Sequence, residues 1–145
     1  MLTFFYTFAI NKIKRKLMAE IPDVYVSRKT EIVAQFRKIL DSHLDDLMEG
    51  RIDKMYEIKE IADILCLHPV HLSKVIKLET GHHACYFYEQ RILLEAKKLL
   101  TDKSLPIGLI AHKLDYDVSN FTKFFKKFSG MTPSSYRKSI LDSFE

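Results

Sequence analysis

The chain contains one pattern of 24 residues twice, and the second copy begins 49 positions after the first. The segment IKEIADILCLHPVHLSKVIKLETG (58–81) aligns without a gap with IGLIAHKLDYDVSNFTKFFKKFSG (107–130). Seven positions are identical, namely Ile58/Ile107, Ile61/Ile110, Ala62/Ala111, Leu65/Leu114, Lys74/Lys123, Lys77/Lys126 and Gly81/Gly130. A repeat at a fixed offset indicates one supersecondary unit that is used twice.

Each copy predicts two helices joined by a tight turn. A short segment with the pattern I-x-x-I-A-x-x-L comes first, and a turn of about three or four residues leads to a second segment with helical periodicity. Ala62 and Ala111 are small, which allows the two helices to cross closely. This is a helix-turn-helix, a unit in which the second helix enters the DNA major groove and the first braces it.

The second helix of the later copy shows why DNA is the favoured partner. Phe121, Phe124, Phe125 and Phe128 follow the i, i+3, i+4, i+7 spacing of one apolar helix face, and Asp117 is placed to cap the helix. Residues 118–138 contain five Lys or Arg and no Asp or Glu, although the chain has 19 acids against 23 bases. A charge run is often only a solvated surface, but this one recurs at Lys74 and Lys77, and a carboxylate here would face DNA phosphates.

The remaining segments also predict helices, so we expect an all-α fold. Residues 82–100 have helical periodicity and should form a long helix that joins the two units. Thr132 and Pro133 begin a last helix, and another is expected over 29–48. The prediction is two helix-turn-helix subdomains joined by a long linker helix, about seven helices in all, plus an N-terminal helical arm.

At these motifs the chain resembles the DNA-binding domain of the AraC/XylS family of bacterial transcription regulators. The matching stretches are IADILCLHPVHLSKVIKLETG, RILLEAKKLL and IAHKLDYDVSNFTKFFKKFSGMTPSSYR, within residues 55–138. The resemblance implies a seven-helix bipartite domain. Its recognition helices, about 69–80 and 118–129, would read successive major grooves on one face of DNA.

The chain departs from the family pattern in three places. The second turn is one residue shorter than usual and has Asp115 where glycine is common, which bears on the docking angle of the second recognition helix. His68 replaces the usual serine cap, and we expect it to be a weaker cap. Lys74 and Lys123 stand where arginine is common, which predicts less guanine readout and an A·T-leaning site.

We expect the DNA contacts to come from eleven residues of the two units and the last helix. Lys77 and Lys126 should bind phosphates, whereas Val70 can contact thymine methyl groups and Asn120 can pair with adenine. The full set is Val70, His71, Ser73, Lys74, Lys77, Ser119, Asn120, Thr122, Lys123, Lys126 and Arg137.

The N-terminal segment 1–28 has two interpretations. The stretch MLTFFYTFAINKIKRK has an apolar run too short to span a bilayer, which needs about 20 residues. It could be the end of a truncated membrane segment, or an arm that packs on the domain or on a second chain, and we favour the arm. The DNA-binding domain then occupies 29–145. Too few residues precede the first unit for a sensor domain, which indicates a stand-alone regulator or a fragment.

The chemistry of the side chains indicates a binding protein and not an enzyme. Cys66 and Cys85 occupy core-like positions in the pattern, which fits a reducing cytoplasm. Cys66, His68 and His71 lack the second ligand pair of a zinc finger, and nothing accompanies them that would make a Cys–His catalytic pair. We therefore expect no metal and no cofactor.

The predicted partners are double-stranded DNA and RNA polymerase. A monomer should be sufficient to bind two grooves, and the expected location is the cytoplasmic nucleoid. The alternative is a basic helical module that binds proteins or membrane surfaces.

Overall fold

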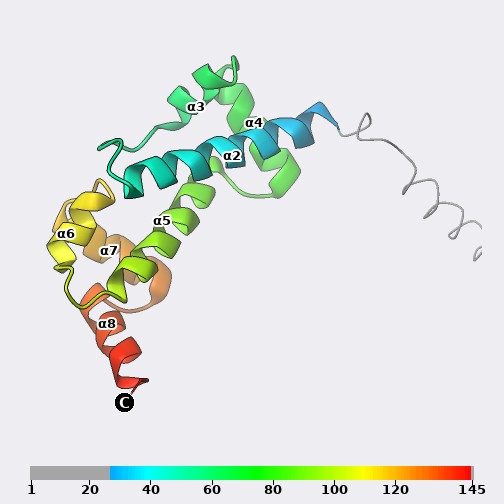
Figure 1. Cartoon of the computed structure of the whole chain (residues 1–145). Helices are drawn as coiled ribbons and strands as arrows, with labels where there is room; N and C mark the ends of the chain where they lie inside the picture. The colour runs from blue at the N-terminus through cyan, green and yellow to red at the C-terminus, as the bar shows by residue number, and fades with distance from the viewer. Residues whose placement is uncertain (1–26, 145) are drawn as a thin grey trace, which may run out of the picture.

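The computed structural model describes residues 27–144, which form seven helices and no strand. They are, in chain order, α2 (Arg28–Met48), α3 (Ile58–Ile64), α4 (Pro69–Thr80), α5 (Ala84–Leu100), α6 (Ile107–Lys113), α7 (Val118–Ser129) and α8 (Pro133–Asp142) (Figure 1). The predicted all-α fold with about seven helices is confirmed for these residues. The predicted arm at 1–28 lies almost wholly outside them.

The two copies of the repeat fold into matching units. α3 and α6 have seven residues each, α4 and α7 have twelve each, and all boundaries keep the sequence offset. The turns match as well, because Cys66 (φ 54°) and Asp115 (φ 61°) occupy equivalent positions and both adopt the left-handed conformation. A repeated sequence has therefore produced a repeated backbone.

Side chains cap α4 and α7, the second helices of the two units, as the sequence indicated. His68 begins α4, and its Nδ1 accepts a hydrogen bond from the backbone N–H of Val70 at 3.2 Å. Asp117 does the same for α7, accepting from the backbone N–H of Asn120 at 2.9 Å. His68 thus performs the capping role that serine or aspartate usually has. Both helices end at a left-handed glycine, Gly81 or Gly130.

The core is built around two long helices, α2 and α5. α2 packs on α3, α4 and α5, with Phe36 and Leu44 fully buried. α5 continues into the second unit, where it contacts α6 and α8, and where Phe121 and Phe125 are fully buried. α5 therefore links the two cores, as predicted for the linker helix (Figure 1).

One prediction about the core is wrong. Cys66 and Cys85 are both exposed free cysteines. Cys66 lies in the left-handed turn between α3 and α4, and Cys85 follows the buried Ala84 in the first turn of α5. The apolar pattern around each cysteine was real, but the turn and the helix phase direct these two side chains to solvent.

None of the helices in the described part of the chain is both long enough and apolar enough to cross a membrane.

Candidate nucleic-acid interface

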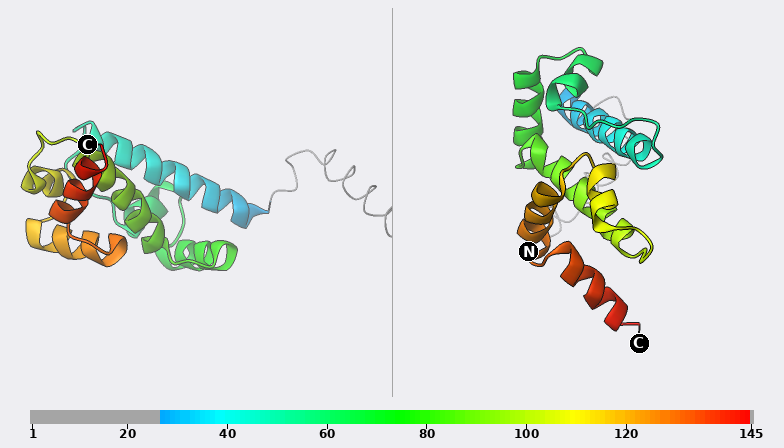
Figure 2. Two further views of the ribbon diagram at one scale, coloured as in Figure 1. Left: turned by 90° about the horizontal axis from the view of Figure 1, so that it is seen from below. Right: turned by 90° about the vertical axis from the view of Figure 1, so that its left-hand side faces the viewer.

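The two predicted recognition helices lie on the same side of the molecule. Both views of Figure 2 place α4 and α7 along one edge, with α2 away from that edge and α5 crossing between the units. The unit repeat alone did not require this arrangement, because it depends on the direction in which α5 carries the second unit. The geometry lets one chain present two helices to one surface.

α4 buries one face and presents the other to solvent. Leu72, Val75 and Ile76 are buried against the first core. The predicted contact residues lie on the other side: Val70, His71, Lys74 and Lys77 are exposed and Ser73 is half-buried. The acidic residue of α4, Glu79, accepts a hydrogen bond from the Thr30 hydroxyl of α2 at 3.2 Å, so its charge is held toward α2.

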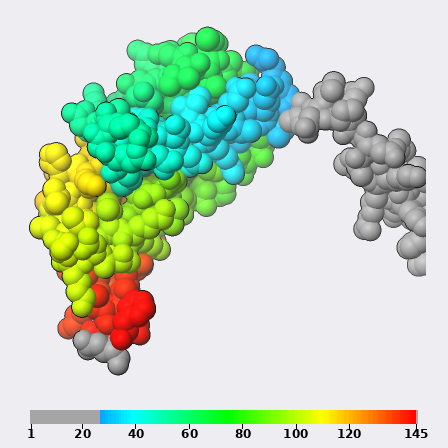
Figure 3. All heavy atoms as spheres, in the orientation of Figure 1, coloured from blue at the N-terminus to red at the C-terminus, as the bar shows by residue number. Residues whose placement is uncertain are grey.

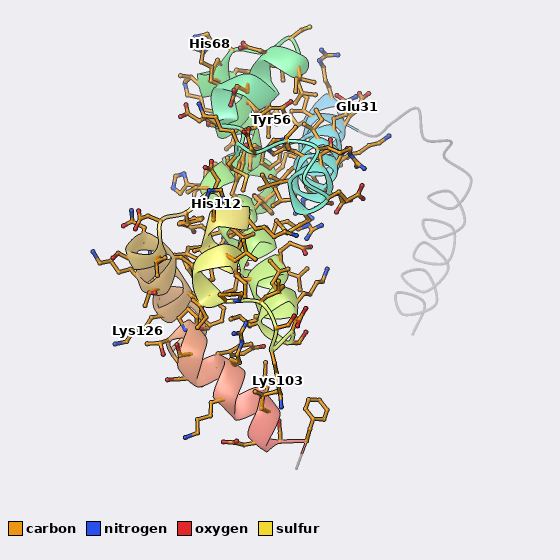
Figure 4. The ribbon with its side chains drawn as sticks, turned by 60° about the vertical axis from the view of Figure 1, so that its left-hand side comes forward. Glu31, Tyr56, His68, Lys103, His112 and Lys126 are labelled. Carbon is orange, nitrogen blue, oxygen red and sulfur yellow. The ribbon has the colours of Figure 1, made fainter. Side chains whose placement is uncertain are left out.

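α7 repeats this arrangement without any acid. Phe121 and Phe125 are fully buried, and the predicted contact residues Ser119, Asn120, Lys123 and Lys126 are exposed while Thr122 is half-buried. The Thr122 hydroxyl donates to the backbone carbonyl of Val118 at 2.8 Å. Lys126 points away from the body of the protein in Figure 4. Together α4 and α7 expose cations and small polar groups on one side of the fold.

The side chain of Asn120 is held in position by the helix cap. Its amide nitrogen donates to Asp117, the residue that also caps the backbone of α7. A primary amide has two N–H donors and a carbonyl oxygen. One donor is engaged by Asp117, which leaves the second donor and the oxygen for the two-bond pairing that adenine offers in the major groove.

Arg137 is placed differently from the other predicted contacts. Its guanidinium donates to the backbone carbonyls of Leu100 at 3.1 Å, Asp102 at 3.1 Å and Leu105 at 2.7 Å. These carbonyls belong to the end of α5 and the loop that follows it. Arg137 therefore ties α8 to the linker helix, and the structure gives it a role inside the domain.

A second arginine fixes the linker helix to the first unit. Arg91 of α5 donates to Asp41 at 3.0 Å and to Asp45 at 2.9 Å on α2, and it also pairs with Glu95. Burial acts to raise the pKa of the Glu95 carboxyl, but the hydrogen bonds and charges of Arg91 and Lys98 outweigh it and the pKa is lowered. α5 is thus held against α2 by ion pairs from the half-buried Arg91 to two exposed carboxylates, as well as by apolar packing.

Sequence reasoning missed the contact between the two units. The α6–α7 turn lies against the segment that joins α2 to α3, where Asp115 accepts a hydrogen bond from the backbone N–H of Met55 at 3.0 Å. Nearby, the Lys113 ammonium donates to the carbonyl of Met48 at 3.3 Å. The one signal in the sequence was the presence of Asp115 where the resembling family commonly has glycine.

Residues 27–144 contain no group of three or more His, Cys, Asp or Glu side chains that could hold a metal ion. Cys66, His68 and His71, the residues weighed as ligands, do not form such a group.

Two helix-turn-helix units with their second helices on one side define a bipartite DNA-binding domain. A scan against protein families finds a match over residues 61–139 to the family described as "Helix-turn-helix domain". The match covers more than half of the chain, and the chain belongs to the AraC/XylS family of DNA-binding transcription regulators. The family is one of regulators and not of enzymes.

Among characterised relatives, the arabinose operon regulatory protein of Escherichia coli K12 is 25% identical over 130 residues, which cover 89% of this chain and 43% of that protein. Its counterpart in Salmonella typhimurium is 27% identical over 103 residues, covering 68% of this chain and 37% of the relative. The chain thus spans only about two fifths of the length of these curated relatives.

Solved structures show the same fold. The C-terminal domain of AraT, a response regulator from Geobacillus stearothermophilus, superposes with a TM-score of 0.66 at 29% identity, over 78% of this chain and 88% of that one. The DNA-binding domain of AdpA, solved in complex with a target DNA, has a TM-score of 0.61 at 14% identity, over 72% of this chain and 91% of that one. The likeness to AdpA shows the fold alone.

Proposed function

We propose that this protein binds a specific duplex DNA site by placing α4 and α7 in two successive major grooves, and that it regulates transcription from that site. The observation that carries the proposal is the position of the two helices on one side of the fold, each with an exposed face of cations and small polar groups. Successive major grooves on one face of DNA are about 34 Å apart. The complex of AdpA with its target DNA, on the same fold, supports duplex DNA as the ligand.

The two outer faces differ, so the site should be asymmetric. α4 presents Val70, His71 and Ser73, where α7 presents Ser119, Asn120 and Thr122. A monomer with two such faces does not need a palindrome. We propose that Lys74 and Lys123 contact the site without the planar fork that reads guanine, so that A·T pairs are favoured.

Base reading and phosphate anchoring should be carried by different residues. Val70 and Asn120 lie near the helix starts, where the docking geometry brings side chains to base edges. Lys77 and Lys126 lie farther along and should meet phosphates. The Lys77 ammonium donates to the carbonyl of Gly81 at 2.8 Å in the structure, and it has further donors for a phosphate.

The experiment begins with selection of a binding site from a random duplex pool. Affinities of Asn120→Ala and Lys126→Ala are then measured on the selected site and on scrambled DNA at two salt concentrations. Asn120→Ala should weaken the selected site by about 1–3 kcal/mol and scrambled DNA little. Lys126→Ala should weaken both DNAs alike and lower the salt slope by about one ion.

The chain offers a matched control for the loss of charge. Lys103 is an exposed lysine in the loop between α5 and α6, and Figure 4 shows it on a different side of the second unit from Lys126. Lys103→Ala removes the same charge and should leave the salt slope unchanged. Equal weakening of both DNAs by Asn120→Ala, together with a changed base preference in Lys126→Ala, would reverse the roles assigned here.

The other candidate function is a basic module for proteins or membrane surfaces. Binding to anionic vesicles as strong as to duplex DNA, with no preference among DNA sequences, would favour that function. The proposed regulation of transcription implies RNA polymerase as a second partner and the bacterial nucleoid as the location. We propose that the DNA-binding domain spans 29–145 and that segment 1–28 is an arm.

A further inference from the structure

The two helix-turn-helix units also touch directly, at a place beside the linker helix where Met55 and Tyr116 line one cavity with Tyr88 of α5. The α6–α7 turn of the second unit meets the segment between α2 and α3 of the first unit. Figure 3 shows the surface of the α2–α3 region lying directly against that of α6, and in Figure 4 His112 of α6 lies where the two units meet. The direct polar contact of the turn itself is the 3.0 Å hydrogen bond from the Met55 N–H to the Asp115 carboxylate.

Met55 belongs to a rigid part of the first unit. Three consecutive backbone N–H groups here each donate to a side chain from a different element. Met55 donates to Asp115 at 3.0 Å, Tyr56 to His43 of α2 at 2.8 Å, and Glu57 to Glu60 of α3 at 2.6 Å. The segment is therefore fixed to α2 and to α3, and through Asp115 to the second unit.

The other end of the contact is equally well fixed. Asp115 adopts the left-handed conformation (φ 61°), and its own N–H donates to the carbonyl of His112 at 3.1 Å. Leu114 before it is fully buried, and the N–H of Tyr116 after it donates to Ala111 at 2.9 Å. The Asp115 carboxylate is thus held by a hydrogen-bonded turn of the second unit and accepts from a fixed amide of the first unit. We call this hydrogen bond between Asp115 and Met55 the strut.

The left-handed backbone at Asp115 could be adopted by glycine, so the carboxylate is needed for the contact to the first unit and not for the turn. Glycine fits this conformation at the lowest steric cost, while aspartate is among the few other residues that tolerate it. Glycine has no side chain with which to reach the first unit. The equivalent residue of the first unit, Cys66 (φ 54°), has the same backbone, but its exposed side chain lies in the turn of the first unit and not at this junction. Only the copy that faces the other unit carries the carboxylate.

We propose that Asp115 is a positioning residue that sets the orientation of the second helix-turn-helix unit relative to the first, and thereby the spacing of half-sites that the protein accepts. This inference rests on the proposed two-groove binding. The contact to DNA is made by other residues, and Asp115 acts through the backbone of Met55. Without the strut, the second unit is held by α5, by apolar packing and by the 3.3 Å bond from Lys113 to the carbonyl of Met48. We expect it to sample orientations in which α7 does not meet its groove.

The expected loss of DNA affinity follows from the fraction of molecules whose two units are oriented to fit both grooves. Apparent affinity falls in proportion to that population. If loss of the strut leaves about 10–20% of molecules in the competent orientation, binding to the complete site weakens by about 5- to 10-fold. Binding to either half-site alone should stay within about 2-fold, because a single helix does not sense the orientation of the other.

Three variants separate positioning from folding. Asp115→Gly removes the carboxylate and relaxes the turn. Cys66→Gly is the matched control, since it relaxes the equivalent turn and leaves the strut in place. Asp115→Asn keeps the shape, tolerates the left-handed backbone and retains an oxygen that accepts a hydrogen bond. It should keep binding close to wild type and serves as the conservative variant if Asp115→Gly fails to fold.

Two measurements on the whole chain decide the proposal. The first compares residual dipolar couplings of the two units in the DNA-free protein. Both units should report one alignment in the wild type and in Cys66→Gly, and two different alignments in Asp115→Gly. The second measures affinity for the selected site, for each half-site, and for sites with one or two base pairs inserted between the halves. Asp115→Gly should lose affinity for the selected site and discriminate less against the inserted spacers.

Each failure has its own signature. Asp115→Gly with one common alignment, unchanged affinity for the selected site and unchanged spacer preference would overturn the strut. An equal loss on the selected site and on both half-sites would also overturn it, because it would indicate a general structural role. If the wild type binds the selected site no more tightly than a half-site, the two-groove function fails, and the dipolar couplings still decide whether Asp115 orients the units.

Discussion

The stability of the first unit should depend on pH through one buried histidine, His43. The side chain is 3% exposed, its Nε2 accepts the backbone N–H of Tyr56 at 2.8 Å, and its ring stacks on the Tyr56 ring with a centroid distance of 3.7 Å. An imidazole can accept at Nε2 only while that nitrogen carries no proton. Burial lowers the pKa of His43, and the charges of Asp46 and Glu60 offset this only in part.

The direction and the size of this pH dependence follow from the coupling between proton binding and folding. A histidine whose pKa is lowered by folding is neutral in both states above its ordinary pKa, about 6.5. Below that pH the unfolded chain takes up a proton that the folded protein does not bind. The free energy of unfolding therefore falls with falling pH, by at most about 1.4 kcal/mol per pH unit, until the lowered pKa is reached.

His43→Phe removes this dependence and keeps an aromatic ring in place. At pH 7.5 the variant should be less stable by about 1–3 kcal/mol, because the N–H of Tyr56 loses its acceptor. Toward pH 5 the stability of the two proteins should converge, since only the wild type loses stability by protonation at this site. The lowered pKa of Glu95 acts in a more acidic range, because its contribution is lost only as pH falls below about 4.5.

The assay is urea unfolding between pH 5.0 and 7.5, with the exposed His112→Gln as a matched histidine replacement that should leave stability unchanged throughout. Parallel pH profiles for the wild type and His43→Phe would refute the reasoning. They would mean that His43 is protonated equally in the folded and unfolded states, so that its bond to Tyr56 is not the source of any pH dependence.

Three further outcomes are expected. Arg91→Ala should lower the free energy of unfolding by about 2–3 kcal/mol in urea, because Glu95 stays buried with one partner fewer; no loss would show that apolar packing alone holds α5 to α2. Arg137→Lys keeps the charge but lacks the planar fork that binds the carbonyls at the end of α5, so it should lower stability by about 1–2 kcal/mol and leave DNA affinity unchanged. A loss confined to DNA binding would instead support the predicted DNA contact of Arg137. Deletion of 1–26 should leave DNA affinity within a few-fold by titration, with a change in oligomeric state by light scattering, and a deletion variant that cannot fold would place that segment in the core.

Much of the fold could be predicted from the sequence because its signals are local. Helical periodicity, caps such as Asp117 and the terminal glycines act over a few residues, and they fixed where helices begin and end. The buried face of α7 followed from the spacing of Phe121 and Phe125. The repeat then identified two equivalent units, and the motifs placed them in the correct family.

The roles of individual side chains were harder to predict, because a residue type does not say which way its helix or turn points. The sequence placed Cys66 and Cys85 in the core, and the structure exposes both thiols. The sequence also predicted a DNA contact for Arg137, and the structure adds bonds from its guanidinium to carbonyls at the end of α5. These bonds depend on the packing of α8 on α5, and the DNA contact of Arg137 stays a prediction.

Two helix-turn-helix units with basic outer faces could be read directly from the chain, since that information is carried by short-range periodicity repeated along it. How the two units face each other emerges only in the folded protein. The bond between Asp115 and Met55 joins residues 60 positions apart, and it exists because α5 returns the second unit to the first. No local pattern encodes such a contact, because its geometry is the sum of every helix direction between the two residues.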